Sequence, residues 1–161
     1  EDEFIDEDLS MKEYLRQIIS SFKETSKKEF SLNLEQDLNS KKIYKSIEIV
    51  YGLRNFIGNA NKFSKNQINI FLKSNTKNTE IIIQDDGPGF PKDLIEKSKL
   101  GEPYIRTIDQ DNISKYGLGL GTFIGKTLLE KNYANIIFKN SKEKVGAIVI
   151  IKWRNKDLKQ I

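Results

Sequence analysis

The turn-forming residues of this 161-residue chain are concentrated in one stretch, and this limits the folds that it can adopt. All three prolines and seven of the ten glycines lie between residues 87 and 125. Because Gly and Pro interrupt helices and strands, the sequence predicts one irregular segment within an otherwise regular succession of elements. The irregular segment is therefore the first place to look for a functional site.

The hydrophobic periodicity on both sides of this segment predicts three helices and five strands. Helical spacing recurs at about 11–22, 42–64 and 121–131, and Ser10 with Glu13 forms a capping box before the first helix. Strand patterns occur at about 30–34, 67–73, 79–85, 134–139 and 145–153. Since many consecutive strands can pair as hairpins, we expect an α/β fold, specifically an α+β two-layer sandwich whose mixed sheet is covered on one face by three helices.

Composition removes several classes of function. The chain contains neither cysteine nor histidine, so it holds no disulfide, thiolate metal site or imidazole that could act as a base or accept a phosphoryl group. No apolar run approaches the roughly 20 residues of a membrane-spanning helix. The net charge of +4 comes from scattered lysines and indicates a solvated surface more than a nucleic-acid partner. The acidic start, residues 1–10, is interpreted as a linker.

One short motif, "QDDGPGF" at 84–90, follows the strand expected at 79–85. Asp85 would end that strand at the edge of the sheet, where its carboxylate can lie at the floor of a pocket. The missing side chains of Gly87 and Gly89 would let a flat ligand approach the backbone. Taken alone, the motif is more typical of a turn that merely ends a strand, and the two motifs below favour the pocket.

A second motif lies on the long helix. Asn55, Asn59 and Lys62 are spaced i, i+4 and i+7, so they share one helical face. An amide oxygen is a ligand suited to Mg²⁺, and a lysine ammonium attracts phosphates. The alternative for these residues is a polar seam that faces water.

A third motif, "GLGLGTFIGKT", places Gly117, Gly119 and Gly121 before the next helix. The free N–H groups of a helix N-terminus attract phosphate. Two more familiar phosphate-binding patterns fail here, because Thr122 stands where a dinucleotide fingerprint needs glycine and Leu120 stands where a P-loop needs it.

Together the three motifs resemble the nucleotide-binding elements of the GHKL ATPase superfamily, which includes the catalytic domains of histidine kinases. They occur in the expected order, about 26 and then about 32 residues apart. The segments "LGEPY", "FIGKTLLE" and "GAIVIIKW" are most similar to the redox-responsive RegB/PrrB group of sensor histidine kinases. The resemblance covers about residues 40–153.

This resemblance implies a role for each motif residue. Asp85 would accept the adenine amino group, Asn59 would hold Mg²⁺, and Lys62 and Asn55 would lie near the phosphates of ATP. Residues 91–116 would form a lid over the nucleotide. The complete set of ATP-binding residues expected from the resemblance is Asn55, Asn59, Lys62, Phe63, Asp85, Gly87, Gly89, Phe90, Tyr104, Gly117, Gly119, Leu120, Gly121 and Thr122.

Asn55 distinguishes branches of the superfamily, because hydrolytic members and serine-phosphorylating anti-sigma-factor kinases carry Glu at that position. An amide cannot take a proton at neutral pH, which disfavours efficient hydrolysis and the serine-kinase alternative. Histidine kinases place the acceptor histidine on a separate domain, so the resemblance implies that this chain holds no catalytic residue of its own. A nucleotide-free interaction module with the same fold is the remaining alternative.

The resemblance also implies an organisation for the parent protein. Residues 1–10 would link an upstream dimerisation and phosphoacceptor domain to a catalytic domain at 11–155, and 156–161 would be a tail. The expected partners are those upstream helices and, indirectly, a response regulator. We expect no nucleic-acid partner and no direct membrane contact by this domain, a monomeric fragment of a homodimeric parent, and a cytoplasmic location beneath an inner-membrane sensor.

Overall fold

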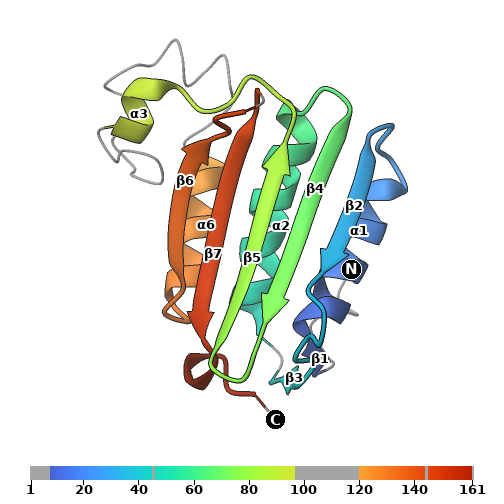
Figure 1. Ribbon diagram of the computed structural model, residues 1–161, viewed down its shortest axis with the longest axis vertical. Helices are drawn as coiled ribbons and strands as arrows, with labels where there is room; N and C mark the ends of the chain where they lie inside the picture. Colours follow the sequence, from blue (N-terminus) through green and yellow to red (C-terminus); the bar gives the residue numbers. More distant parts are fainter. Residues whose placement is uncertain (1–7, 45, 97–119, 144, 161) are drawn as a thin grey trace.

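The computed structural model describes residues 8–44, 46–96, 120–143 and 145–160, which form two layers (Figure 1). One layer is a five-stranded sheet in the order β2-β4-β5-β7-β6. The helices α1, α2 and α6 lie behind this sheet and cover one of its faces (Figure 1). The expected two-layer sandwich with a mixed sheet and three covering helices is confirmed.

The sheet is mixed because one strand pair is parallel and the others are antiparallel. The edge strand β2 (Glu29–Leu34) runs parallel to β4 (Gln67–Ser74). The strand β5 (Asn78–Asp85) pairs antiparallel with β4 and with β7 (Ala147–Arg154), and β6 (Asn135–Asn140) forms the other edge. Alternate residues of the central strands are buried beneath the helices, as the period of two predicts.

Serine side chains cap the N-termini of two of the helices. In α1 (Met11–Lys23) the expected capping box is present, since Ser10 accepts from the Glu13 N–H while the Glu13 carboxylate accepts from the Ser10 N–H. In α2 (Ile47–Phe63) the side chain of Ser46 caps the first turn. The prediction that this helix begins at about 42 was wrong, because β3 (Lys42–Ile43) pairs with β1 (Leu9–Ser10).

Helix α6 (Leu120–Glu130) packs closely against α2 because two glycines lie in the contact. A β-carbon at Gly52 of α2 would lie 2.6 Å from Leu129, and one at Gly125 of α6 would lie 3.0 Å from Phe56. Without side chains at these positions, the two helices approach until Asn59 contacts Thr122. This close packing brings the second and third sequence motifs together.

After β7 the chain turns back onto the body. A 3₁₀ turn, η2 (Asn155–Asp157), is followed by Leu158, which is buried, and Gln160 forms a bridge to Ile43. The segment 156–161, expected as a tail, thus packs against the body as far as Gln160. A short helix, α3 (Lys92–Glu96), begins the segment expected to be a lid. None of the helices in the described parts of the chain is long and apolar enough to cross a membrane.

Candidate functional site

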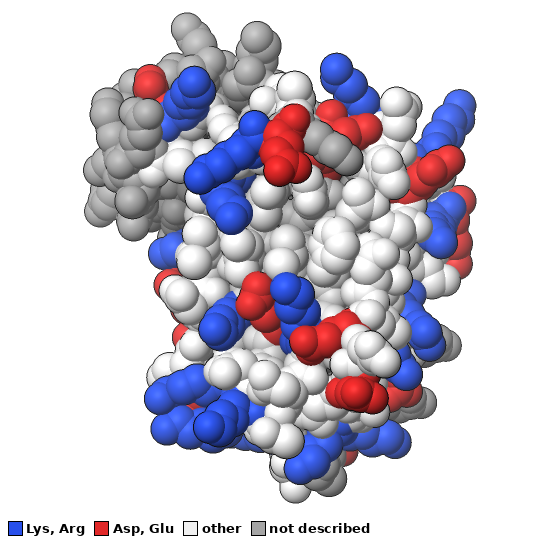
Figure 2. Space-filling view, in the orientation of Figure 1, with Lys and Arg blue, Asp and Glu red and all other residues white. Residues whose placement is uncertain are grey.

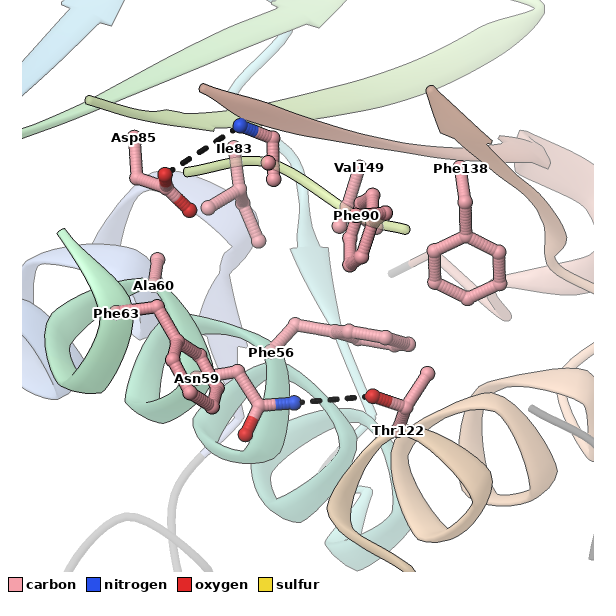
Figure 3. Close-up of a pocket in the computed structure, with 12 residues that line it drawn as sticks. Phe56, Asn59, Ala60, Phe63, Ile83, Asp85, Phe90, Thr122, Phe138 and Val149 are labelled. Carbon is pink, nitrogen blue, oxygen red and sulfur yellow. Dashed lines mark hydrogen bonds between the residues drawn. The ribbon is translucent and has the colours of Figure 1, made fainter. Parts of the chain in front are cut away.

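A hollow of about 490 Å³, including the part open to solvent, lies between the sheet and the helices α2 and α6 (Figure 3). Its walls are mostly apolar, with three polar side chains that come from three different elements: Asp85 from β5, Asn59 from α2 and Thr122 from α6. The residues that line it are Phe56, Asn59, Ala60, Phe63, Ile83, Asp85, Gly89, Phe90, Thr122, Phe138, Ala147 and Val149. An apolar pocket with a few oriented polar groups is typical of small-molecule sites.

Asp85 lies at the end of β5 and is 8% exposed. Its Oδ1 accepts from the backbone N–H of Gly87 at 2.8 Å and of Ala147 at 3.4 Å. Its Oδ2 has no hydrogen-bond partner among the described residues, so one carboxylate oxygen can accept from a ligand. Burial raises the pKa of the Asp85 carboxyl above its usual value, against the opposing effect of these two hydrogen bonds.

Asp86 has a different role from its neighbour. Its Oδ1 accepts from the backbone N–H groups of Lys65, Asn66 and Gln67 at 2.7, 3.1 and 3.3 Å, in the turn that joins α2 to β4. Burial raises the pKa of Asp86, but the hydrogen bonds outweigh it and hold the pKa below the usual value. Two acids therefore occur together at the end of β5 because Asp85 faces the hollow and Asp86 holds the turn between α2 and β4.

The two glycines of the first motif have a packing reason that the sequence interpretation missed. A β-carbon at Gly87 would lie 2.3 Å from the Phe63 carbonyl oxygen, and one at Gly89, whose φ is +83°, would lie 2.7 Å from Asn140 Oδ1. Asn140 also accepts from the Phe90 N–H at 2.7 Å and donates to the Phe90 carbonyl at 2.9 Å. The absence of side chains at Gly87 and Gly89 thus makes room for the Phe63 carbonyl and for Asn140. The side-chain amide of Asn140, in β6, holds the turn through two hydrogen bonds to Phe90.

The polar face of α2 meets the first turn of α6. Asn59 Nδ2 donates to Thr122 Oγ1 at 3.2 Å, and Thr122 is 1% exposed (Figure 3). Asn59 Oδ1 lies 3.3 Å from the point where a β-carbon of Gly121 would be. Asn55, one turn earlier, donates from Nδ2 to the Tyr51 carbonyl at 2.7 Å. The oxygen of Asn59 is therefore presented at the start of α6.

Lys62 and Phe63 continue this face toward the end of α2. Lys62 is exposed, and its Nζ lies 5.4 Å from the centroid of the Phe63 ring, within range of a cation–π contact. Because Phe63 lines the hollow, the ammonium lies close to its mouth. An ammonium at that place could attract an anionic group of a bound ligand.

Six of the fourteen expected site residues line this hollow: Asn59, Phe63, Asp85, Gly89, Phe90 and Thr122. Gly87 lies next to Phe63 and Asp85, and Gly121 lies next to Asn59, so both adjoin residues of its wall. Leu120 begins α6, while Tyr104, Gly117 and Gly119 lie outside the described residues. The lining residues that the sequence interpretation missed are Phe56, Ala60, Ile83, Phe138, Ala147 and Val149. Their apolar periodicity predicts burial but does not distinguish a pocket wall from the core.

The described residues contain no group of three His, Cys, Asp or Glu side chains that could hold a metal ion. Asn59 Oδ1 is a neutral oxygen ligand whose amide nitrogen is already bonded to Thr122. A single protein oxygen suits Mg²⁺, which takes its other ligands from water and phosphate. The residues present are thus compatible with a magnesium ion that arrives with a phosphorylated ligand.

Comparison with known proteins adds an independent line of evidence. Residues 45–157 match the family described as histidine kinase-, DNA gyrase B-, and HSP90-like ATPase. Sensor histidine kinase RegB of Cereibacter sphaeroides is 36% identical in an alignment of 121 residues that covers 66% of this chain and 26% of RegB. A putative NtrY-like sensor histidine kinase of Rickettsia typhi is 33% identical over 57% of this chain and 14% of its own length. The chain thus spans about a quarter or less of these relatives.

Solved structures show the same fold. The catalytic domain of histidine kinase ThkA has a TM-score of 0.71 at 20% identity, with 92% of this chain and 96% of that chain covered. The mycobacterial sensor histidine kinase MprB has a TM-score of 0.69 at 19% identity, with the same coverage. At these identities the likeness concerns the fold alone.

Proposed function

This chain belongs to the family of histidine kinase-, DNA gyrase B- and HSP90-like ATPases and is homologous to sensor histidine kinases. We propose that it binds Mg-ATP and positions it so that the γ-phosphoryl group is transferred to a histidine on a separate helical domain. The observation that carries the proposal is the hollow in which Asp85, Asn59 and Thr122 converge from three elements. The residues expected from the sequence supply its polar groups.

Adenine would occupy the apolar part of the hollow. The unbonded Oδ2 of Asp85 would accept the adenine amino group, while Oδ1 stays bonded to the backbone of Gly87 and Ala147. The flat base would lie among the rings of Phe56, Phe63 and Phe90 and the aliphatic walls. The two oxygens of the Asp85 carboxylate would thus have different roles. The backbone at the end of the strand orients Oδ1, and the ligand would bond to Oδ2.

The phosphates would lie toward the start of α6. Backbone N–H groups at a helix N-terminus bind phosphate, and Lys62 would add a positive charge. Asn59 Oδ1 would hold Mg²⁺, and Thr122 would keep the Asn59 amide oriented through its hydroxyl. A bound Mg²⁺ would neutralise part of the triphosphate charge.

The nucleophile would come from outside this chain. The sequence contains no histidine, and Asn55 holds its amide nitrogen on the Tyr51 carbonyl and cannot act as a base at neutral pH. We therefore propose that residues 11–155 serve as the ATP-binding domain of a longer, dimeric sensor kinase. In that protein 1–10 would connect to the acceptor helices, a response regulator would receive the phosphoryl group, and this domain would lie on the cytoplasmic side of the inner membrane.

Phosphoryl transfer in trans tests this proposal. The chain alone should bind Mg-ATP, hydrolyse it very slowly and remain unlabelled by γ-labelled ATP. When the acceptor helices of the parent are added as a separate piece, those helices should become labelled, and the label should be acid-labile and alkali-stable, as expected of phosphohistidine. Asn59→Asp and Lys62→Ala should reduce transfer more than they reduce thermal stability.

The same experiment separates the alternatives. Acid-stable label on Ser or Thr would favour the serine-kinase branch, which carries Glu where this chain has Asn55. The absence of any ATP-dependent rise in the thermal midpoint would favour a nucleotide-free interaction module, because a ligand that binds only the folded state must stabilise it.

A further inference from the structure

The face of the sheet that the helices leave open carries an ordered apolar stripe. Figure 2 looks onto this face, where uncharged side chains cover the middle of the sheet and alternating positive and negative residues lie below them. Side chains of odd number in β4 and β6, and of even number in β5 and β7, point to this face. Their sequence neighbours in β4, β5 and β7 are buried beneath the helices, and Ile136 and Phe138 of β6 pack against the core.

The strand registers align these side chains in three rows across β4, β5, β7 and β6. The first row is Asn69, Gln84, Ile148 and Lys139; the second is Phe71, Ile82, Ile150 and Ile137; the third is Lys73, Glu80, Lys152 and Asn135. We call the second row the open-face stripe. Its four residues are all apolar, whereas the rows on both sides are mostly polar.

The open-face stripe is not part of the hydrophobic core. None of its members belongs to the buried cluster or to the partly buried residues packed against that cluster, and Ile137 is 47% exposed. An antiparallel sheet that faces water on one side normally alternates between apolar and polar residues. A contiguous apolar band with a charged border is instead typical of an interaction surface.

We propose that the open face is an interface between two copies of this chain. A two-fold axis parallel to the strands, midway between β5 and β7, would place β5 of one copy over β7 of the other and β4 over β6. Phe71 would then meet the partner's Ile137, and Ile82 would meet the partner's Ile150. Two sheets would stack face to face in the aligned arrangement common in β-sandwiches, with the same surface used by both copies.

One pair of opposite charges on this face is self-complementary under that axis. Glu80 would lie opposite the partner's Lys152, and by symmetry this ion pair would occur twice. Lys73 would lie opposite the partner's Asn135, and Lys139 opposite the partner's Asn69. Gln84 would meet the partner's Ile148, a polar-to-apolar contact at the border. None of the twelve positions brings two like charges together, and on a face that carries three lysines and one glutamate the Glu80–Lys152 pair, formed twice, is the charge match that favours a second copy.

The size of the patch predicts a weak association. Four strands at about 4.8 Å and three rows at about 6.6 Å cover a plane of about 400 Å² on each copy. Stable interfaces bury about 800 Å² of surface on each partner, so the isolated chains should be mostly monomeric and pair only at high concentration. This inference does not depend on the proposed kinase activity.

Sedimentation equilibrium from micromolar to millimolar protein tests the interface. The unmodified chain should show reversible dimerisation. Ile82→Lys should weaken it by roughly 100-fold or more, because the substitution occurs twice in a symmetric contact and removes two buried isoleucines. The matched control is Ile124→Lys on the helical side, where an exposed isoleucine lies away from the open face. It should leave the dimerisation constant unchanged.

Charge exchange distinguishes this contact from a folding effect. Glu80→Lys alone and Lys152→Glu alone should each weaken self-association, since each opposes like charges. An equimolar mixture of the two variants should associate again, because each then presents the charge that the other lacks, and thermal melts of each variant show whether the monomer is intact. A chain that stays monomeric at millimolar concentration, an association indifferent to Ile82→Lys, or a mixture without recovery would overturn the proposal.

Discussion

Replacing Asp85 with asparagine isolates the contribution of one carboxylate oxygen to nucleotide binding. In the structure Oδ1 holds the backbone of Gly87 and Ala147, while Oδ2 is unbonded. Asparagine can keep an oxygen at the first position, but it places an N–H₂ group where the adenine amino group should donate. Two donors then face each other across the pocket.

The magnitude follows from the type of bond that is lost. A hydrogen bond to a charged group contributes about 1.5–3 kcal/mol, so the affinity for Mg-ATP should fall about 10-fold to 150-fold in Asp85→Asn. The thermal midpoint should not fall, since the backbone bonds remain and a buried charge has been removed. Asp85→Ala should lose the same affinity and also become less stable, because it leaves two buried N–H groups without their acceptor.

Isothermal titration calorimetry with Mg-ATP measures the affinity, and differential scanning calorimetry of the same samples measures the stability. Asp86→Asn is the matched control, because it removes the neighbouring charge without changing the wall of the hollow, and its affinity should remain close to that of the unmodified chain. A folded Asp85→Asn chain that binds Mg-ATP as tightly as the unmodified one would refute the assignment of Asp85 to adenine.

The raised pKa of Asp85 adds a pH dependence with a defined sign. Between the ordinary value of 3.8 and its higher value in the fold, the native state binds more protons than the unfolded state. The stability of the unmodified chain relative to Asp85→Asn should therefore fall as pH rises through that window and become constant above it. Nucleotide affinity should show the opposite trend and weaken as the carboxylate is protonated. A stability difference that rises with pH in this window would contradict the reasoning.

Three further predictions concern the surroundings of the site. Asp86→Ala should lower the free energy of unfolding, measured in urea, by about 1–3 kcal/mol, since three backbone N–H groups lose their acceptor. Because the fold lowers the pKa of Asp86, its contribution to stability should be fully present above pH 3.8 and should disappear as the pH falls through the pKa of Asp86 in the folded state. Thr122→Val should weaken Mg-ATP binding about 10-fold by freeing the Asn59 amide, and Thr122→Ser should restore it, as titration calorimetry would show. Gly52→Ala should cost about 1–3 kcal/mol of stability in urea, because its β-carbon would lie 2.6 Å from a buried leucine of α6, whereas Gly58→Ala, with 3.4 Å to its nearest neighbour, should cost little.

The sequence was sufficient to predict the helices and strands that contain a long periodic pattern of apolar residues. The two-layer fold and most element boundaries follow from this spacing. The order of the motifs predicts that Asn59 and Asp85 lie at one site, and both line the hollow. The start of α2 was missed because Ile43 and Ile47 fit a helical stripe, although Ile43 belongs to a strand paired with the residues before α1. Only a contact distant in sequence decides between these two placements.

The residues that hold the site in place were not predictable from motifs. Asn140 is 50 residues from Phe90, and nothing in the local sequence of β6 indicates that its amide fastens the turn after β5. The role of Asp86 was not predicted either, because strand alternation places consecutive side chains on opposite faces but does not show that the Asp86 carboxylate bonds to the backbone of residues 65–67. Long-range hydrogen bonds of this kind become visible only when the sheet register is known.

The hydrogen bonds of Asp86 to the turn between α2 and β4 also affect the thermodynamics of ligand binding. Asp86 directly follows Asp85, the last residue of β5, so the turn after α2 and the acid expected to meet the base are joined through a single peptide unit and three hydrogen bonds. The spacing between the two sides of the hollow is thus fixed before a ligand arrives. Little conformational entropy remains to be lost on these two walls, and more of the interaction energy can appear as affinity.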